Sequence, residues 1–212
     1  MAQSSSGMPL LIVGGAVFGA ALLMVPVLFM AAALGGTGPA PSTAGGGGSL
    51  SGDCDYDKIL SDAAAGKAEG TAYVAGKTEK VPPKFIPIYS SVSEKKKLGG
   101  CGPSILAGIH SIESSFADTG YSTVNFAGAG GPWQFLQSSW EAFIGGCNEP
   151  GSKSWPAYSV ENGACAAANH LISGGAPKNW RDGIYSYNNA DWYVYAVTLQ
   201  AQRFAGDVGG GT

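Results

Sequence analysis

The chain has 212 residues, with 12 Lys and Arg, 15 Asp and Glu, and a formal net charge of -3. This mild balance excludes the strongly basic surface of a nucleic-acid-binding protein, so we expect no nucleic-acid partner. The length suits one globular domain plus a targeting segment, and the first ionisable side chain is Asp53. All of the charge therefore belongs to the later part of the chain.

An apolar segment follows a short tail formed by residues 1–9. At about 1.5 Å rise per residue, residues 10–34 can cross a bilayer core of about 30 Å, which predicts a transmembrane helix. A cleaved signal peptide is the alternative, because the small residues 31–33 and 40–44 suit a cleavage site. The apolar core of a signal peptide has only about 7–15 residues, so the length favours a retained anchor.

The rest of the chain divides into a linker, a domain and a short tail. Residues 35–52 are rich in Gly, Ser, Pro and Ala, a composition typical of a flexible linker. Residues 53–208 form the predicted domain, and residues 209–212 form a flexible tail. Together with the apolar segment, this organisation predicts a domain held outside the cytoplasm at the cell membrane, or secreted if the segment is cleaved.

The apolar spacing within the domain favours short helices joined by Gly-rich connections, so we expect a mainly α fold. One helix follows Pro82 and Pro83 and ends in the lysine run at residues 95–97. Residues 66–81 are expected to form a loop. The other predicted helices are Pro103–Phe116, Ser138–Phe143, Ser159–Ile172, Trp180–Tyr185 and Asp191–Phe204.

Four cysteines lie beyond the apolar segment, and an even number in an exported domain favours two disulfides. Three pairings are possible. We prefer Cys54 with Cys101 and Cys147 with Cys165, because each bond then closes a contiguous segment. A zinc site is not expected, because there is no C-x-x-C motif and the two histidines lack ligand spacing. We therefore predict no metal and no other cofactor.

Glu113 has an unusual position in the helix predicted from Pro103. The apolar stripe of that helix is formed by Leu106, Ile109, Ile112 and Phe116. Glu113 lies seven residues after Leu106 and four after Ile109, so it projects from the same stripe. Partial burial raises the pKa of a carboxyl group, which would let Glu113 donate a proton near neutral pH. Spacing alone also allows a structural role.

The other carboxylates have structural explanations. Glu141 follows Ser138 by three residues, which suggests a capping box, and Asp191 suits the N-cap of the last helix. Glu161 and Asp182 are expected in first helical turns, where the helix dipole favours acidic side chains. The acidic cluster around Asp55 lacks the remainder of a calcium-binding loop and indicates the start of a helix.

Four sequence motifs follow one another along the domain. They are Glu-Ser-Ser-Phe at 113–116, Ala-Gly-Ala-Gly-Gly-Pro-Trp-Gln-Phe at 127–135, Trp140, and Tyr-Ser-Tyr-Asn-Asn-Ala-Asp-Trp-Tyr-Val at 185–194. Between residues 81 and 205 this pattern resembles the lytic transglycosylases of the lysozyme-like superfamily, most closely the exported actinobacterial forms. In that family a Glu-Ser ends the catalytic helix, a Gly-Pro-Met-Gln-Phe turn follows, and a Tyr-Asn precedes a Tyr-Val helix. The resemblance implies a compact, helical, lysozyme-like domain.

The resemblance also implies roles for individual residues. Glu113 would be the catalytic acid/base, with the amide of Gln134 beside it and the hydroxyl of Tyr187 in the same cleft. Ser114 and Asn188 match further motif positions that we assign to substrate binding.

Two departures from the family pattern affect the expected binding surface. Trp133 replaces the usual methionine, so we assign Trp133 to substrate binding as well and expect an altered sugar-contacting surface at that point. Residues 117–126 replace the common His-Gly, so the loop after Glu-Ser should have its own shape. Of the aromatic residues near these motifs, only Tyr187 is assigned to the cleft, because helix-spaced aromatics more often belong to the core. The others are Trp140, Tyr185, Trp192 and Tyr193.

The implied reaction is cleavage of the β-1,4 bond between N-acetylmuramic acid and N-acetylglucosamine in peptidoglycan glycan strands, giving a 1,6-anhydro product. An internal hydroxyl replaces water, so a second carboxylate is not required. A hydrolytic muramidase of the same fold and a non-catalytic wall-binding or assembly protein are the alternatives. A role in conjugation or secretion is compatible with the resemblance, and the sequence does not indicate an oligomeric state.

Overall fold

The computed structural model describes residues 54–209, and within this range the fold is mainly helical, as predicted. The α-helices are α1 (Tyr56–Asp62), α2 (Lys67–Val74), α3 (Ile86–Lys96), α4 (Gly102–Ser114), α5 (Gln137–Phe143), α6 (Val160–Ser173), α7 (Trp180–Asn188) and α8 (Asp191–Val208). Two short 3-10 helices are η1 (Ala64–Gly66) and η2 (Pro83–Phe85). Strands β1 (Ala129–Gly130) and β2 (Phe135–Leu136) form an antiparallel pair, in which Ala129 faces Leu136 and Gly130 faces Phe135.

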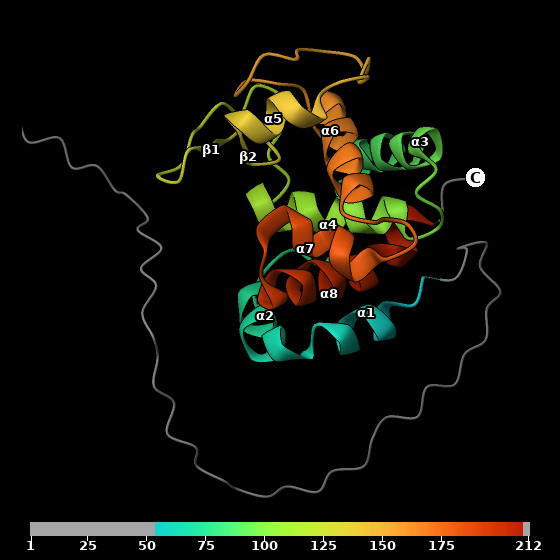
Figure 1. Ribbon diagram of the computed structural model, residues 1–212. Helices are drawn as coiled ribbons and strands as arrows, with labels where there is room; N and C mark the ends of the chain where they lie inside the picture. Colours follow the sequence, from blue (N-terminus) through green and yellow to red (C-terminus); the bar gives the residue numbers. More distant parts are fainter. Residues whose placement is uncertain (1–53, 210–212) are drawn as a thin grey trace, which may run out of the picture. The chain divides into compact units, whose positions relative to one another are not determined.

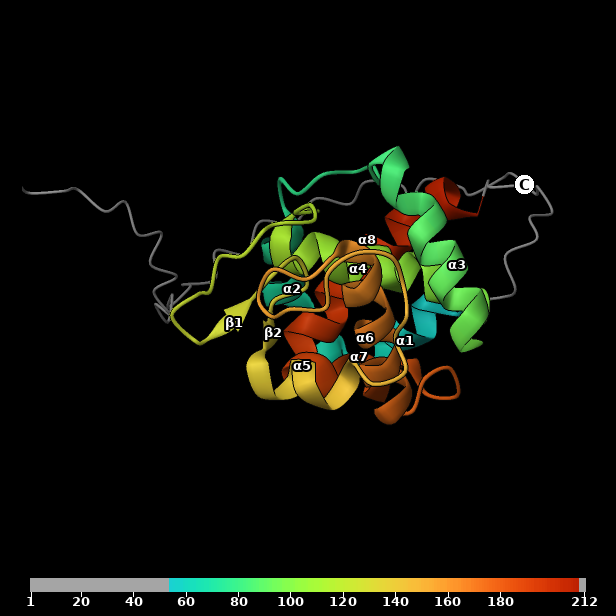
Figure 2. The same cartoon turned by 90° about the horizontal axis from the view of Figure 1, so that it is seen from above.

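The helices are arranged around α4 and α8, which pack against each other (Figure 1). α1 and α2 cover α8 on the side away from α5, while α3 and α6 lie on the other side of α4. Viewed from above, the β1–β2 hairpin lies at the opposite end of the described domain from α3 (Figure 2). The carboxyl end of α4 therefore lies between α2 and α8 on one side and the hairpin segment on the other.

A close approach of backbones makes the contact between α4 and α8 possible. A Cβ atom added at Gly108 of α4 would lie 2.7 Å from the carbonyl oxygen of Val197 in α8. α4 is buried along almost its whole length, from Gly102 to Ile112 except for Pro103. A helix enclosed in this way holds its last turn, which carries Glu113, in a fixed place.

The predicted helix after Pro82 and Pro83 is confirmed as η2 followed by α3, with Lys95 and Lys96 in the last turn. Asp55 accepts a hydrogen bond from the backbone N–H of Lys58, so the acidic cluster starts α1 as expected. Glu161 and Asp182 lie in the first turns of α6 and α7.

The prediction of a loop over residues 66–81 is wrong, because α2 occupies Lys67–Val74. A Cβ atom added at Gly66 would lie 2.1 Å from the backbone nitrogen of Trp192. A Cβ atom added at Gly70 would lie 2.7 Å from the carbonyl oxygen of the same residue. The glycines that weaken the local helix signal are therefore required for packing against α8. Tertiary contact overrides low helix propensity here.

Two predicted caps are also wrong. No side chain caps α5 at its N-cap residue Leu136, and Glu141 instead accepts a hydrogen bond from the Gln137 amide at 3.0 Å. Ala190 is the N-cap of α8, so Asp191 is the first helical residue and pairs with Arg181 at 2.5 Å. In both helices the carboxylate binds a side chain instead of the free backbone N–H groups.

The preferred disulfide pairing is confirmed. Cys54 bonds to Cys101 with their Cα atoms 5.0 Å apart, and Cys147 bonds to Cys165 with their Cα atoms 5.8 Å apart. The first bond joins the segment before α1 to the start of α4, and the second joins the segment after α5 to α6.

The predicted transmembrane segment, residues 10–34, and the linker, residues 35–52, lie outside the described residues. Within residues 54–209, none of the helices combines the length and apolar character needed to cross a bilayer.

Candidate active site

Glu113 is the penultimate residue of α4, at a sharply defined helix end. Ser115 and Phe116 both have left-handed backbone conformations, with φ of 53° and 64°. Their N–H groups donate to the carbonyls of Ser111 and His110, which satisfies two acceptors of the last turn. Glu113 remains partly exposed next to buried Ile112, so its carboxyl group lies at the boundary between the core and the surface.

Tyr193 holds the carboxyl group of Glu113. The Tyr193 hydroxyl donates a hydrogen bond of 2.5 Å to Oε1 of Glu113, across 80 positions of sequence. Tyr193 lies in α8 and is only 1% exposed, so its ring is fixed by the core. The contact between α4 and α8 thus positions both partners of this bond.

The segment around α2 places a positive charge close to the same carboxyl group. The ammonium group of Lys77 lies 3.4 Å from the carbonyl oxygen of Ile112 and 4.9 Å from the centre of the Tyr73 ring. The Tyr73 hydroxyl also points to the Ile112 carbonyl, at 3.5 Å. A cation at this position interacts favourably with the carboxyl end of the α4 dipole and with ionised Glu113.

The pKa of Glu113 is set by three opposing influences. Burial raises this pKa to about 7, while the hydrogen bond from Tyr193 and the charge of Lys77 act to lower it. Near neutral pH both the protonated and the ionised forms are therefore well populated. A carboxyl group with this property can donate a proton and then accept one at the same pH.

Further residues predicted for the site come from α7 and the turn before β2. The Tyr187 hydroxyl donates to the carbonyl oxygen of Trp133 at 3.0 Å, and its ring lies parallel to that of Tyr193 with centroids 6.1 Å apart. Gln134, the next residue, has a left-handed backbone (φ 48°), and its amide donates to the Gly131 carbonyl at 2.8 Å. Gln134 and Tyr187 both keep partly exposed side chains.

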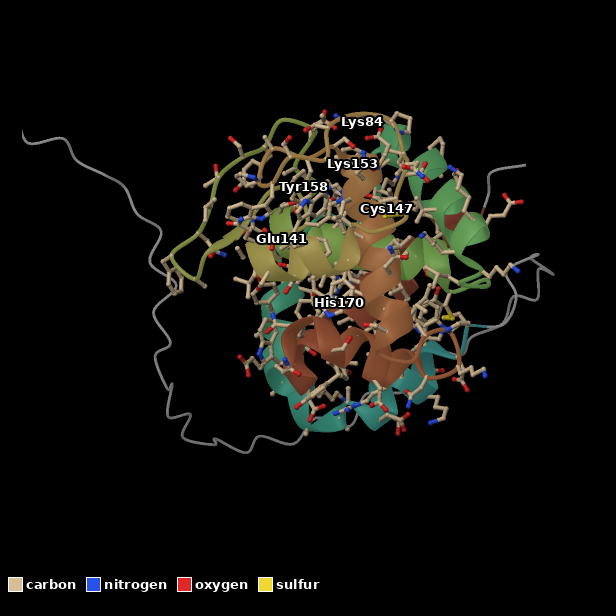
Figure 3. All side chains as sticks on the ribbon, turned by 45° about the horizontal axis from the view of Figure 1, so that its top comes forward. Lys84, Glu141, Cys147, Lys153, Tyr158 and His170 are labelled. Atoms are coloured by element: carbon tan, nitrogen blue, oxygen red, sulfur yellow. A yellow bond between two sulfur atoms is a disulfide. The ribbon has the colours of Figure 1, made fainter. Side chains whose placement is uncertain are left out.

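His170 of α6, labelled in Figure 3, lies between α5 and α7 and contacts Tyr187. Its ring stacks between Phe143, with centroids 4.1 Å apart, and Tyr187, with centroids 4.9 Å apart. Burial lowers the pKa of His170, so the ring is neutral near pH 7. The order Phe143, His170, Tyr187, Tyr193 gives a column of aromatic rings that ends at the hydrogen bond to Glu113.

The expectation that Trp133 contacts sugar directly does not hold, because its side chain is 0% exposed. The indole stacks on His110 with centroids 4.7 Å apart, and its N–H donates to the Val160 carbonyl at 3.1 Å. A Cβ atom added at Gly163 would lie 2.1 Å from the indole, so Gly163 provides the space that the larger ring needs. Trp133 contributes its backbone carbonyl to the site and its side chain to the core.

Two other predicted substrate-binding residues differ in how they lie. The Ser114 hydroxyl donates to the Pro132 carbonyl at 2.5 Å and accepts from the backbone N–H of Ala117 at 3.1 Å. Ser114 thereby ties the end of α4 to the turn that carries Gln134. Asn188 is exposed at the last position of α7, and nothing in the described structure explains a binding role for it.

Tyr187 stacks with Tyr193, which binds Glu113, while Gln134 follows Trp133, whose carbonyl accepts from Tyr187. Three further residues at the site were not predicted from the sequence. The sequence predicts Tyr193 as a core aromatic, Lys77 as part of a loop, and His170 as a histidine without the spacing of a metal ligand. Their contacts to the site join segments far apart in the sequence, so no local pattern indicates them. Among residues 54–209, no group of His, Cys, Asp and Glu side chains is arranged to bind a metal ion.

No family model matches the sequence, and neither a curated protein nor a solved structure matches it.

Proposed function

We propose that this chain is an exported, lysozyme-like lytic transglycosylase that cleaves peptidoglycan glycan strands with Glu113 as its single acid/base. The observation that carries the proposal is the Glu113 carboxyl group, with a pKa near 7 and a fixed hydrogen bond from Tyr193. The order of the motifs around Glu113, Gln134 and Tyr187 supports the same assignment.

In the first step, protonated Glu113 would donate its proton to the oxygen of the β-1,4 bond. The bond from C1 of N-acetylmuramic acid to that oxygen then breaks, leaving an oxocarbenium-like centre and a free hydroxyl on the departing sugar. The carboxylate that results is stabilised by the Tyr193 hydrogen bond and the charge of Lys77. These are the two influences that lower the pKa of Glu113.

In the second step, ionised Glu113 would accept the proton of the muramyl C6 hydroxyl as that oxygen bonds to C1. The product is a 1,6-anhydro sugar, and Glu113 is protonated again for the next cycle. The charged or titratable side chains that act on the pKa of Glu113 are Tyr193 and Lys77, neither of which is a carboxylate. The proposed mechanism likewise uses one carboxyl group, because the internal hydroxyl takes the place of water and of a nucleophilic carboxylate.

The two disulfides support an extracytoplasmic location, because such bonds persist in oxidising compartments. The apolar segment at residues 10–34 would anchor the chain in the cell membrane, with the catalytic domain in the wall space.

Product analysis tests the proposal. The purified full-length chain is incubated with peptidoglycan, and the products are identified by mass spectrometry. We expect 1,6-anhydro muramic ends from the wild type and at least a roughly 1000-fold lower rate from Glu113→Gln. Glu141→Gln is the matched control, because Glu141 is exposed on α5 and should not affect the rate.

Other products would identify the alternatives. Reducing muramic ends from the wild type would show a hydrolytic muramidase. Binding without any products would show a wall-binding protein, and full activity of Glu113→Gln would refute the catalytic assignment.

A further inference from the structure

The large apolar side chains that remain exposed among residues 54–209 are concentrated in one segment. Ile172 lies on α6, and the other four lie between residues 121 and 136. These four are Tyr121, Val124, Phe126 and Leu136. Phe126 is the extreme case, with 90% of its surface exposed. A concentration of exposed apolar side chains in a folded domain indicates a surface that contacts another molecule.

The turn that carries Phe126 is fixed by hydrogen bonds to Asn125. The Asn125 side-chain oxygen accepts from the N–H groups of Ala127 and Ala129, at 2.9 and 3.0 Å. The Asn125 backbone N–H donates to the Ala129 carbonyl at 2.8 Å, and its carbonyl accepts from Gly128 at 3.0 Å. The backbone that presents Phe126 is therefore ordered before any ligand arrives, which lowers the entropic cost of binding.

The charge of this surface indicates the class of ligand. No Asp, Glu, Lys, Arg or His occurs from Thr119 to Trp140. An anionic lipid surface would require Lys or Arg beside the exposed apolar groups. A segment without charged side chains that carries an aromatic ring and side-chain amides suits a neutral sugar, whose C–H face packs on the ring while its hydroxyl and acetamido groups form hydrogen bonds.

A series of contacts links the turn to Glu113. The Asn125 amide donates to the side-chain oxygen of Gln134 at 3.1 Å. Gln134 follows Trp133, whose carbonyl accepts from Tyr187. Tyr187 stacks with Tyr193, which holds Glu113. The turn is thus continuous with the site already described.

We propose that Phe126 forms an outlying sugar-binding subsite, stacking on a neutral N-acetylglucosamine unit of the glycan strand whose scissile bond lies at Glu113. This assignment rests on the proposed function for its substrate. Residues 117–126, which depart from the family pattern, would then lengthen the binding surface beyond Gln134. The subsite favours glycan strands that are long enough to reach both Glu113 and Phe126.

Binding to a strand that cannot be cleaved tests the subsite. The probe is a set of peptide-free glycan strands released from peptidoglycan by an amidase, and the protein is the full-length chain carrying Glu113→Gln. Adding Phe126→Ala should weaken binding roughly three- to tenfold, whereas Phe126→Trp should retain it. Ile172→Ala is the matched control, since it removes an exposed apolar side chain from α6 and should leave binding unchanged.

Fluorescence of the indole introduced by Phe126→Trp reports contact at this position. We expect its emission to change when glycan strands are added. Unchanged glycan binding in Phe126→Ala would overturn the proposal. Quenching of the indole by brominated lipid tails, in vesicles of phosphatidylcholine and phosphatidylglycerol, would also overturn it, because the partner would then be the bilayer.

Failure of the subsite can be distinguished from failure of the proposed function. If the wild type cleaves glycan strands but Phe126→Ala leaves glycan binding unchanged, only the subsite is refuted. If the wild type releases no products but Phe126→Ala weakens glycan binding, the proposed enzymatic function is refuted and the sugar-binding surface is retained.

Discussion

At the scale of single residues, the raised pKa of Glu113 links the stability of the fold to pH. The ordinary value is 4.5 and the folded value is about 7, so the native state binds this proton more tightly than the unfolded chain does. The carboxyl group therefore costs no stability below about pH 4.5 and costs progressively more as the pH rises through about 7. Glu113→Gln removes the titration and retains an acceptor for Tyr193. We expect it to be more stable than the wild type by about 2–3 kcal/mol at pH 8 and by much less at pH 4.

Urea unfolding of both proteins at the two pH values measures this difference. The comparison needs no enzymatic activity, so it tests the environment of Glu113 independently of the proposed function. Equal stability differences at pH 4 and pH 8 would show that the folded structure does not raise the pKa of Glu113.

The hydroxyl of Tyr193 should affect both the rate and its pH dependence. Tyr193→Phe removes a hydrogen bond that lowers the pKa of Glu113, so activity that requires the protonated form should persist to higher pH. The carboxylate formed after proton transfer also loses its donor, and kcat should fall by about 10- to 100-fold. A pH profile of kcat on peptidoglycan measures both effects.

Tyr195→Phe is the matched control for this change. Tyr195 lies on the same helix, α8, and is buried like Tyr193, but its hydroxyl does not bind Glu113. If Tyr193→Phe left the basic limb of the profile where the wild type has it, Tyr193 would have only a structural role.

At the scale of the elements, the contact between α4 and α8 depends on the lack of a side chain at Gly108. Gly108→Ala places a methyl group against the Val197 carbonyl at 2.7 Å, a backbone atom that cannot move aside. Overpacking of this kind costs about 1–3 kcal/mol, which exceeds the gain in helix propensity of about 1 kcal/mol. We expect a net loss of stability and a weaker bond between Glu113 and Tyr193, seen in denaturant unfolding and in the rate.

Gly206→Ala provides the opposite case on α8. An added Cβ atom there meets nothing within 4 Å, so only the gain in helix propensity remains. This variant should be as stable as the wild type or up to about 1 kcal/mol more stable. If both substitutions had the same sign, backbone contact would not explain the glycine in α4.

The elements predictable from the sequence are those whose local pattern and tertiary packing agree. α3, α4 and α6 have apolar side chains at helical spacing, so their positions could be predicted to within a few residues. α2 could not, because Gly66 and Gly70 serve the contact with α8 and weaken the local signal. The order of the motifs predicts Glu113 and Tyr187 as site residues. The position of Lys77 near Glu113 cannot be predicted in this way, because it depends on α2 being a helix. Tyr193 reaches Glu113 only because α4 and α8 pack together.

At the scale of the whole molecule, α8 organises the domain, because α1, α2, α4 and α7 all pack against it. One end of α4 is tied by Cys101 to the segment before α1, and the other end carries Glu113. Glu113 lies twelve positions after Cys101, which corresponds to about 18 Å along a helix. Stability at one end of α4 and chemistry at the other can therefore be altered separately.

The two disulfides should contribute unequally to stability. The bond from Cys54 to Cys101 spans 47 positions, and the bond from Cys147 to Cys165 spans 18. If a disulfide acts mainly by restricting the unfolded chain, the longer loop gains more stability, about 4 kcal/mol against about 3 kcal/mol. Replacing both cysteines of a pair by serine, in two separate double variants, should lower the free energy of unfolding in that order.

The activity of these variants separates stability from catalysis. Below its midpoint of unfolding, the variant without the bond from Cys54 to Cys101 should keep the pH dependence of the wild type, because Glu113 lies at the far end of α4, where Tyr193 of α8 binds it. A reversed order of stabilities would mean that native packing around Cys147 and Cys165 outweighs the loop entropy. A shifted pH dependence would mean that the first bond also holds α4 in register with α8, so that the position of Glu113 depends on the whole length of the helix.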